Sequence, residues 1–287
     1  MGLPGVPGRW LQRGLMLVSL VVVPWAWSAE PGEAGLTVVT FNLHHDREDW
    51  PERRRVIQRA LEDLQPDVIA LQEVIQKPHV RNQAAWLARK LGYEYLFVST
   101  DPPGRFKRYG NALLTRRPVL ARHEHLLMPL SDYRTVGHLR IDVDGQEVNL
   151  YATHLNERSD DAGKRIRGEQ IADLLGFVAS TSGNAPVVIA GDFNAQVDAG
   201  DLSGLRQRYG DSYGSVHVNN ELAQVSTLNR HYFDAPRRID HIFFQQDRLV
   251  AREARLLFDQ PYAEGRWASD HYGVWTRLKF APAVIVP

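Results

Sequence analysis

The sequence predicts an α/β sandwich of four layers, in which two mixed β-sheets pack face to face and helices cover their outer faces. Two halves of the chain repeat one order: an amphipathic helix, an apolar strand and then a carboxylate, Glu73 in one half and Asp192 in the other. Segments rich in short strands and turns lie beside both units. No repeat, low-complexity tract or interdomain linker interrupts residues 29–287, so we expect them to form a single domain.

The first half starts with the β-branched and aromatic residues 36–41, which predict a strand ending on Asn42. Apolar residues at three- and four-residue spacing then predict a helix that opens at Pro51. The apolar run 68–71 predicts a buried strand that leads to Glu73. Further elements are expected as a helix at 81–91, strands at 94–99 and 110–115, and three strands between 119 and 153.

The second half contains the longest predicted helix, 160–179, followed by the apolar strand 187–191. This strand leads to Asp192 and Asn194. Side chains two residues apart on an extended chain point the same way, so both groups are expected at one rim of a sheet. A short helix near 202–209 and strands at 239–244, 250–258 and 272–280 complete the expected elements.

The charge balance and the absence of cysteine narrow the class of protein. Lys+Arg and Asp+Glu both number 34, so no global field favours nucleic acid or an anionic membrane. Hydrophobic residues make up 44% and charged residues 24%, which is ordinary for a globular protein. The chain has no cysteine, which excludes a disulfide and a lipid anchor on cysteine.

Residues 1–28 are predicted to be a secretory signal peptide. Arg9 and Arg13 precede a mostly apolar run from Leu15 to Trp27, and small residues then favour cleavage after Ser28 or the next residue. An uncleaved anchor is the alternative, although the run is short for a spanning helix. We therefore expect an exported protein, periplasmic or extracellular.

Polar side chains gather where the predicted strands end or begin. They are Asn42, Glu73, Asn111, His154, Asp192, Asn194, Asp240, Asp270 and His271. Carboxylate and carboxamide oxygens suit Mg²⁺ or Mn²⁺. The sequence has no HExxH motif, no GxSxG elbow and no glycine-rich nucleotide loop. The pattern therefore predicts a metal site for phosphate chemistry.

Seven short motifs carry these residues and stand in a fixed order. They are Thr40-Phe41-Asn42-Leu43, Leu71-Gln72-Glu73-Val74, Tyr109-Gly110-Asn111, Thr153-His154-Leu155, Gly191-Asp192-Phe193-Asn194, Arg238-Ile239-Asp240-His241 and Ser269-Asp270-His271. In this order they resemble the endonuclease/exonuclease/phosphatase family, a Mg²⁺-dependent group that includes deoxyribonucleases, neutral sphingomyelinases and inositol polyphosphate phosphatases. The resemblance covers about residues 36–280 and implies hydrolysis of phosphoric esters, in the first place by a phosphodiesterase.

The resemblance also implies a metal site. Glu73 would be the principal ligand of Mg²⁺ or Mn²⁺, and Asn42 and Asp270 would contribute directly or through water. Either of two loop histidines, His44 and His45, would line this site or be solvated.

Roles at the reacting phosphate follow from the same resemblance. Asp240 would orient His271 beside the phosphate, and Asp192 would position or deprotonate the attacking water. Which of Asp192 and His271 acts as the base stays open. Asn194 would hold Asp192 and a phosphate oxygen, and His154 would bind phosphate or protonate the leaving oxygen.

Three further side chains are expected to bind the phosphate group. Tyr109 and Asn111 would contact its non-bridging oxygens. Arg134 would clamp it with two hydrogen bonds or, alternatively, be a surface charge. The basic loop 105–108 would hold more of an anionic substrate or simply be solvated. Asp46 stands where many bacterial members of the resembled family have glycine. The first loop is therefore expected to differ in backbone conformation at this position, because glycine adopts conformations that aspartate avoids.

The substrate is left open among nucleic acid, a phospholipid head group and a small phosphodiester. A nuclease needs a long basic groove, whereas a lipid enzyme needs an exposed apolar loop, for which 232–233 and 262–267 are candidates. A non-catalytic binding module on the same fold is the alternative from another class, and broken motifs would be its signature. No obligate protein partner is indicated.

Overall fold

The structure is a computed structural model that describes residues 1–2, 35–217, 222 and 224–282. Apart from its first two residues, the predicted signal peptide lies outside the described residues. The contacts place Ala34–Pro287 in one compact unit. No helix in the described part of the chain is long and apolar enough to cross a membrane.

The first sheet has six strands around a parallel pair. Across the sheet they are β11 (Leu249–Leu257), β12 (Gly273–Phe280), β1 (Gly35–Asn42), β2 (Val68–Gln76), β4 (Arg108–Thr115) and β3 (Glu94–Ser99). The helix α1 (Trp50–Leu64) joins β1 to β2, which run parallel. The other neighbours pair antiparallel, and α2 (Gln83–Leu91) connects β2 to β3.

The second sheet follows the same plan. Its order is β5 (Val119–Leu126), β6 (Thr135–Val143), β7 (Gln146–His154), β8 (Val187–Asp192), β10 (Asp240–Phe244) and β9 (Gly210–Asp211). The longest helix, α3 (Asp161–Thr181), joins the parallel pair β7 and β8. Short helices complete the unit: η1 (Leu130–Asp132), η2 (Gly200–Leu202), α4 (Ser203–Arg206) and α5 (Ser212–Val216).

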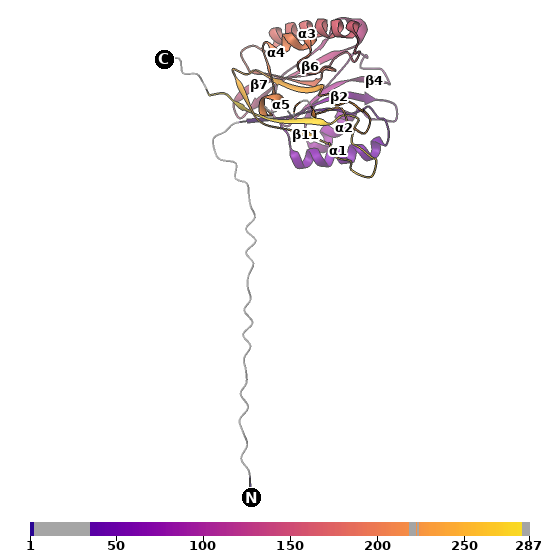
Figure 1. Ribbon diagram of the computed structural model, residues 1–287, viewed down its shortest axis with the longest axis vertical. Helices are drawn as coiled ribbons and strands as arrows, with labels where there is room; N and C mark the ends of the chain where they lie inside the picture. The colour runs from indigo at the N-terminus through magenta and orange to yellow at the C-terminus, as the bar shows by residue number, and fades with distance from the viewer. Residues whose placement is uncertain (3–34, 218–221, 223, 283–287) are drawn as a thin grey trace. The chain divides into compact units, whose positions relative to one another are not determined.

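These elements form the four predicted layers. In Figure 1, α3 and α4 lie above the two sheets, and α1 and α2 lie below them. The predicted fold class, two packed mixed sheets flanked by helices, is therefore confirmed. Capping residues set the helix starts: the side chain of Asp49 accepts a hydrogen bond at the start of α1, and Asp160 does the same for α3.

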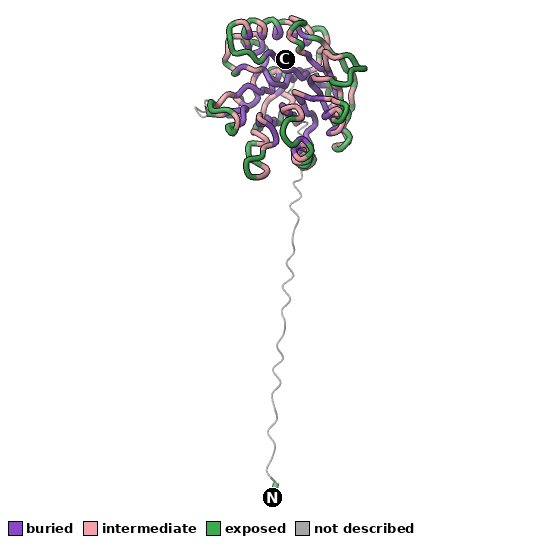
Figure 2. The backbone as a smooth tube through the Cα atoms, turned by 90° about the vertical axis from the view of Figure 1, so that its right-hand side faces the viewer, coloured by how far each residue is buried: buried purple, intermediate pink, exposed green. Residues whose placement is uncertain are grey.

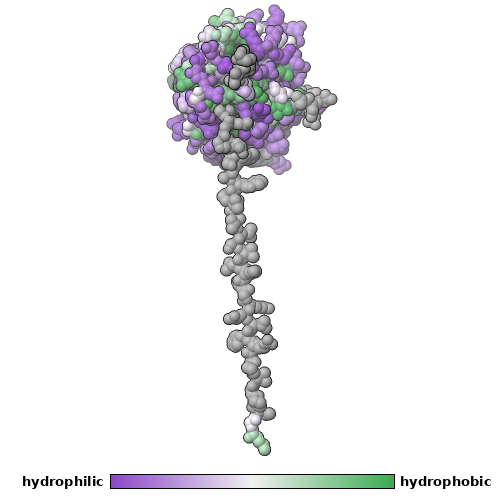
Figure 3. All heavy atoms as spheres, turned by 90° about the vertical axis from the view of Figure 1, so that its left-hand side faces the viewer, coloured by the Kyte–Doolittle hydropathy of each residue, from purple (hydrophilic) through white to green (hydrophobic). Residues whose placement is uncertain are grey.

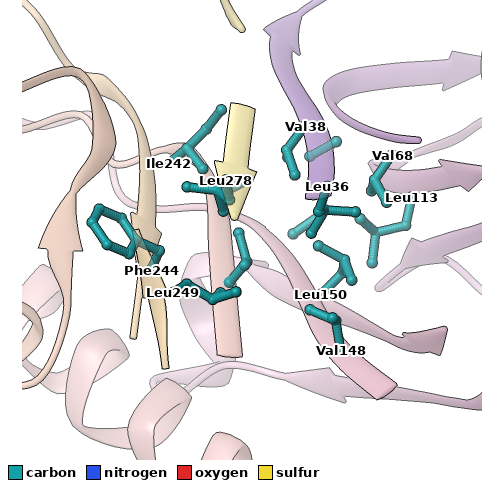
Figure 4. Close-up of a cluster of buried hydrophobic side chains, with 14 of the residues drawn as sticks. Leu36, Val38, Val68, Leu113, Val148, Leu150, Ile242, Phe244, Leu249 and Leu278 are labelled. Carbon is teal, nitrogen blue, oxygen red and sulfur yellow. The ribbon is translucent and has the colours of Figure 1, made fainter. Parts of the chain in front are cut away.

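Alternate residues of one strand serve two different cores. In β1, Leu36 and Val38 point between the sheets, whereas Val39 and Phe41 pack towards α1 and α2. Figure 4 shows the core between the sheets, and Figure 2 shows buried backbone running through the centre of the unit. The surface drawn in Figure 3 is mostly hydrophilic, with small hydrophobic areas. Burial on both faces explains why these strands read as continuous apolar runs.

Gly191 allows β8 to approach β7 closely just before the strand ends at Asp192. A Cβ atom on Gly191 would lie 2.1 Å from the carbonyl oxygen of Thr153, which is a backbone atom and cannot rotate away. By contrast, a Cβ on Gly176, an exposed residue of α3, would meet no atom within 4 Å.

We predict that Gly191→Ala lowers the free energy of unfolding by about 1–3 kcal/mol or more, because the added methyl group forces the strands apart. The matched change Gly176→Ala should raise it by about 0.5–1 kcal/mol through a lower entropy of the unfolded chain. Urea unfolding followed by circular dichroism measures both. Equal midpoints for Gly191→Ala and the unchanged protein would contradict the proposed close contact.

Candidate active site

The ends of both parallel pairs meet at one edge, where polar contacts cross between the two sheets. Asn42 ends β1 and Asp192 ends β8, and the side-chain Nδ2 of Asn42 donates to Asp192 Oδ2 at 3.1 Å. Both side chains are buried. A buried carboxylate with charge-assisted hydrogen bonds is strongly held, so this contact fixes the two strand ends relative to each other.

Asp240 and His271 lie beside Asp192, as the motifs predicted. Asp240 stands directly opposite Asp192 in the register of β8 and β10. The ring nitrogen Nδ1 of His271 lies 2.9 Å from Asp240 Oδ2, and its Nε2 lies 3.8 Å from Asp192 Oδ2. The imidazole therefore sits between two buried carboxylates.

The surroundings of this group raise the pKa values of both His271 and Asp192. Burial lowers the pKa of His271, but the charges of Asp240 and Asp192 outweigh it and raise that pKa to about 10. Burial and the nearby charge of Asp240 raise the pKa of Asp192 to about 7. His271 is thus held as a cation, and Asp192 is a carboxylate that binds a proton more readily than usual.

His154 and Asn194 form the other side of this group. The Nδ2 atom of Asn194 lies 3.0 Å from His154 Nε2 and also donates to the Leu155 carbonyl oxygen at 3.0 Å. His154 Nδ1 is 3.4 Å from the hydroxyl of Tyr109. Burial and the charge of Arg134 hold the pKa of His154 well below its usual value, so this ring is neutral.

Asn194 contacts Asp192 differently from the expectation. Its backbone N–H, and not its side chain, donates to Asp192 Oδ1 at 2.9 Å. The strand ends at Asp192, and Asn194 has a left-handed backbone with φ 53°. Alternation along an extended chain therefore does not apply there, and the side chain turns towards His154.

The three predicted metal ligands meet at the loop that follows β1. Both loop histidines pair with a carboxylate: His44 Nδ1 lies 2.8 Å from Asp270 Oδ2, and His45 Nε2 lies 3.0 Å from Glu73 Oε2. The third predicted ligand, Asn42, uses its Oδ1 to accept from the backbone N–H of His44 at 3.0 Å. Neither histidine is simply solvated.

Both carboxylates are held in the ionised form that a metal requires. Burial raises the pKa of Glu73, but the hydrogen bond from His45 and the charges of nearby histidines bring it down to about 2. Burial likewise raises the pKa of Asp270, but the hydrogen bond from His44 and the charges of His271 and His44 together outweigh it, so that the pKa is lowered. With an amide oxygen nearby, these groups fit a hard divalent cation.

A second group of ligand-type atoms lies deeper in the same edge. One atom each of Asp192, Asp240 and His271 lie within 4.8 Å of one another. Their side chains are 8% exposed or less, whereas those of Glu73 and Asp270 are 20% and 17% exposed. The two groups therefore differ in access: Glu73 and Asp270 are partly open to solvent, whereas His271 is buried and already hydrogen bonded to Asp240.

Arg53 is a site residue that sequence reasoning missed. Although it is only 1% exposed, its guanidinium donates to the carbonyl oxygens of Leu43 at 2.9 Å, Arg47 at 3.0 Å and Ala268 at 2.6 Å. It also donates to the carbonyl of His45 at 3.2 Å. It thereby ties the loop after β1 to the segment that precedes Asp270. The signal was a charged residue at a buried position of an amphipathic helix.

The predicted phosphate-binding residues differ in their surroundings. Asn111 is buried and its Nδ2 donates to the carbonyl oxygen of Thr135 at 3.2 Å, a contact between β4 and β6. The ring of Tyr109 stacks on that of His45, with 5.1 Å between centroids. Arg134 forms an ion pair with Glu157, and its side chain is 11% exposed.

The basic loop and Asp46 also have defined surroundings. Arg105, Phe106 and Lys107 are exposed, and Phe106 is 82% exposed. Asp46 forms an ion pair with Lys77 at 2.7 Å. His44 and His45 have left-handed backbone conformations and form the turn after Asn42. Asp46 has no positive φ, so this position does not require glycine.

Comparison with known proteins places this chain in a family. The model of the Endonuclease/Exonuclease/phosphatase family matches residues 39–271. Nocturnin of Drosophila melanogaster is 28% identical over 188 residues, covering 60% of this chain and 29% of that protein. A putative neutral sphingomyelinase of Drosophila melanogaster is 32% identical over 161 residues, covering 50% of this chain and 36% of that protein. The chain thus spans about a third of the length of these curated relatives.

Solved structures share the fold. The human Nocturnin catalytic domain with bound sulfate anion superposes with a TM-score of 0.70 at 22% identity, covering 86% of this chain and 94% of that one. Zebrafish (D. rerio) TDP2 complexed with single-strand DNA product has a TM-score of 0.70 at 19% identity, covering 86% and 99%. The family predicted from the seven motifs is confirmed by the match over most of the chain. The protein belongs to the endonuclease/exonuclease/phosphatase family.

Proposed function

We propose that this protein is a divalent-metal-dependent hydrolase of phosphoric esters and acts as a phosphodiesterase. The observation that carries the proposal is one edge that joins two ionised, partly accessible carboxylates, Glu73 and Asp270, to the buried group of Asp192, Asp240 and His271. Family membership supports the same reaction class. A non-catalytic binding module has no use for this set of acids and histidines.

Glu73, with Asn42 and Asp270, would hold Mg²⁺ or Mn²⁺. The ion, when bound, polarises a phosphoryl oxygen and offsets the charge that develops on it. The protein residues then orient the other participants. His271 lies between Asp240 and Asp192 and carries a positive charge, which suits it to donate a hydrogen bond to a phosphate oxygen.

We assign the acceptance of the proton from the attacking water to Asp192. A cationic ring that is hydrogen bonded to Asp240 has no free lone pair, so His271 is a donor and not a base in this arrangement. The contacts of Asp192 with Asn42 and with the backbone of Asn194 hold the carboxylate in place. Asn194 and Tyr109 position His154 beside the leaving oxygen, and Asn111 and Arg134 line the phosphate side.

The substrate is proposed to be a phosphodiester of a nucleic acid, a phospholipid head group or a small molecule. A nuclease is the second candidate because the exposed basic residues Arg105 and Lys107 flank the exposed ring of Phe106, a combination suited to single-stranded nucleic acid. Of the proposed lipid-binding residues, Tyr232 donates to Glu48 at 2.8 Å, whereas Phe233 is exposed. We further propose that the protein is exported to the periplasm or the medium.

Removal of the metal or of one of its ligands should abolish activity. Hydrolysis of bis-p-nitrophenyl phosphate with Mg²⁺ or Mn²⁺ should stop in EDTA and fall by about 100-fold or more in Glu73→Gln, which keeps the shape but loses the charge. The exposed residue Glu169 gives the matched control, Glu169→Gln, which should keep full activity. Turnover that survives both EDTA and Glu73→Gln would refute metal dependence.

Asp240→Asn should separate orientation of His271 from substrate binding. Because the amide cannot stabilise the imidazolium, kcat should fall by about 10²- to 10⁴-fold while KM changes little. Steady-state kinetics on the same diester measures both constants, with Asp234→Asn at an exposed position as the control. A change confined to KM would show that Asp240 acts in binding and would count against the proposed pair.

Arg53→Lys should weaken the metal site more than the fold. An ammonium group cannot reach all the carbonyl oxygens that the guanidinium binds, so the loop carrying His44 and His45 should loosen. We expect a higher Mg²⁺ concentration for half-maximal rate, whereas Arg55→Lys, an exposed change on the same helix, should leave it unaltered. Arg53→Lys with a lower melting temperature but an unchanged Mg²⁺ dependence would indicate a structural role alone.

A further inference from the structure

Two histidines face each other across the edge of the second sheet. His123 of the edge strand β5 lies directly opposite His138 of β6, and their Nδ1 atoms are 3.0 Å apart. His123 is exposed, whereas His138 is buried. Both lie on the sheet face that α3 covers, because the His138 ring contacts Phe177 of α3. None of these residues belongs to the candidate active site.

The protein fixes which nitrogen of His138 carries the proton. His138 Nε2 lies 2.9 Å from Asn149 Oδ1. The orientation of Asn149 is set in turn, because its Nδ2 donates to the carbonyl oxygens of Ser182 at 2.9 Å and Ala185 at 3.0 Å. Since an amide oxygen only accepts, Nε2 of His138 must donate, and Nδ1 presents a lone pair to His123.

The ring of His138 is also neutral at physiological pH. Burial is the main cause, and it lowers the pKa of His138 to about 4. A neutral imidazole that donates its other N–H to a protein oxygen is the usual state of a metal-binding histidine.

We propose that His123 and His138 form a site for a late first-row divalent cation, with Zn²⁺ as the ion it binds. Zinc–nitrogen bonds of 2.0–2.1 Å in tetrahedral geometry place two ligand nitrogens about 3.3 Å apart. The observed 3.0 Å needs only a small rotation of the exposed His123 ring. The proton on His123 Nδ1 moves to its other ring nitrogen, Nε2, so that the lone pair of Nδ1 is free to bind the ion.

The neighbouring side chains determine how many protein ligands the zinc site has. His125 lies two residues along β5, on the same face, but its Nε2 is engaged with Asp173 Oδ2 at 2.9 Å and its ring stacks on Phe177. The site therefore has two protein ligands, and water completes the coordination at the open edge. The chain has no cysteine, so no thiolate competes for the ion.

Zinc titration of the protein in excess Mg²⁺ tests this site. Long-range ¹H–¹⁵N spectra of the histidine rings report on each ring nitrogen. The Nδ1 signal of His138 should move on addition of Zn²⁺, and it should move equally in Glu73→Gln, where the candidate active site is impaired. A His138 signal that does not respond to Zn²⁺ would overturn the proposal and leave a simple hydrogen bond between two rings.

The variant His123→Ala removes one of the two proposed zinc ligands. Because His123 is exposed, this change should not disturb the core. Zinc affinity at His138 should fall by about 10-fold or more. Loss of a hydrogen-bond partner of a metal ligand already has an effect of that size, and loss of a ligand itself should have at least as large an effect. His79→Ala, at another exposed histidine, should bind as the unchanged protein does. Undiminished binding in His123→Ala would refute the pair as the ligand set. Hydrolysis of the diester should be the same in both variants.

Discussion

The hydrogen bond between Asn42 and Asp192 joins the two sheets at the point where the candidate active site begins. Other polar contacts at this edge also cross from one sheet to the other. Asn111 of β4 bonds to Thr135 of β6, and His271, just before β12, bonds to Asp240 of β10. The site is therefore a seam between two layers. Its geometry depends on the apolar core between the sheets, which sets how closely their edges approach.

Placement along this seam gives identical carboxyl groups different properties. Glu73 and Asp270 lie where histidines and some solvent reach them, and they stay ionised. Asp192 lies deeper, next to the charge of Asp240, and its affinity for a proton rises. The proposed function uses this difference: the ionised carboxylates are the proposed metal ligands, and the carboxylate with the raised pKa is the proposed base.

Local sequence predicted the strands and the residues at their ends well, because apolar runs, proline and glycine act within a few positions. The strand 187–191 before Asp192 and the helix expected at 81–91, observed as Gln83–Leu91, are examples. Contacts between distant segments were beyond such reasoning. The pairing of His44 with Asp270 has no local signal, because it depends on loops that meet only in the folded chain. The helix periodicity indicates that Arg53 is buried, but it does not show which carbonyl oxygens the guanidinium contacts. Asn194 was predicted at the site, but its backbone turn reversed the expected contacts.

Arg53 holds the first loop through main-chain oxygens, which every kind of residue carries. These contacts of Arg53 therefore do not depend on which side chains the loop residues carry. A change of side chain at a position such as Arg47 leaves these contacts intact, because Arg53 binds only its carbonyl oxygen. Such an arrangement separates the shape of a loop from its chemistry, so that relatives with the same scaffold can acquire new ligands there at little cost in folding.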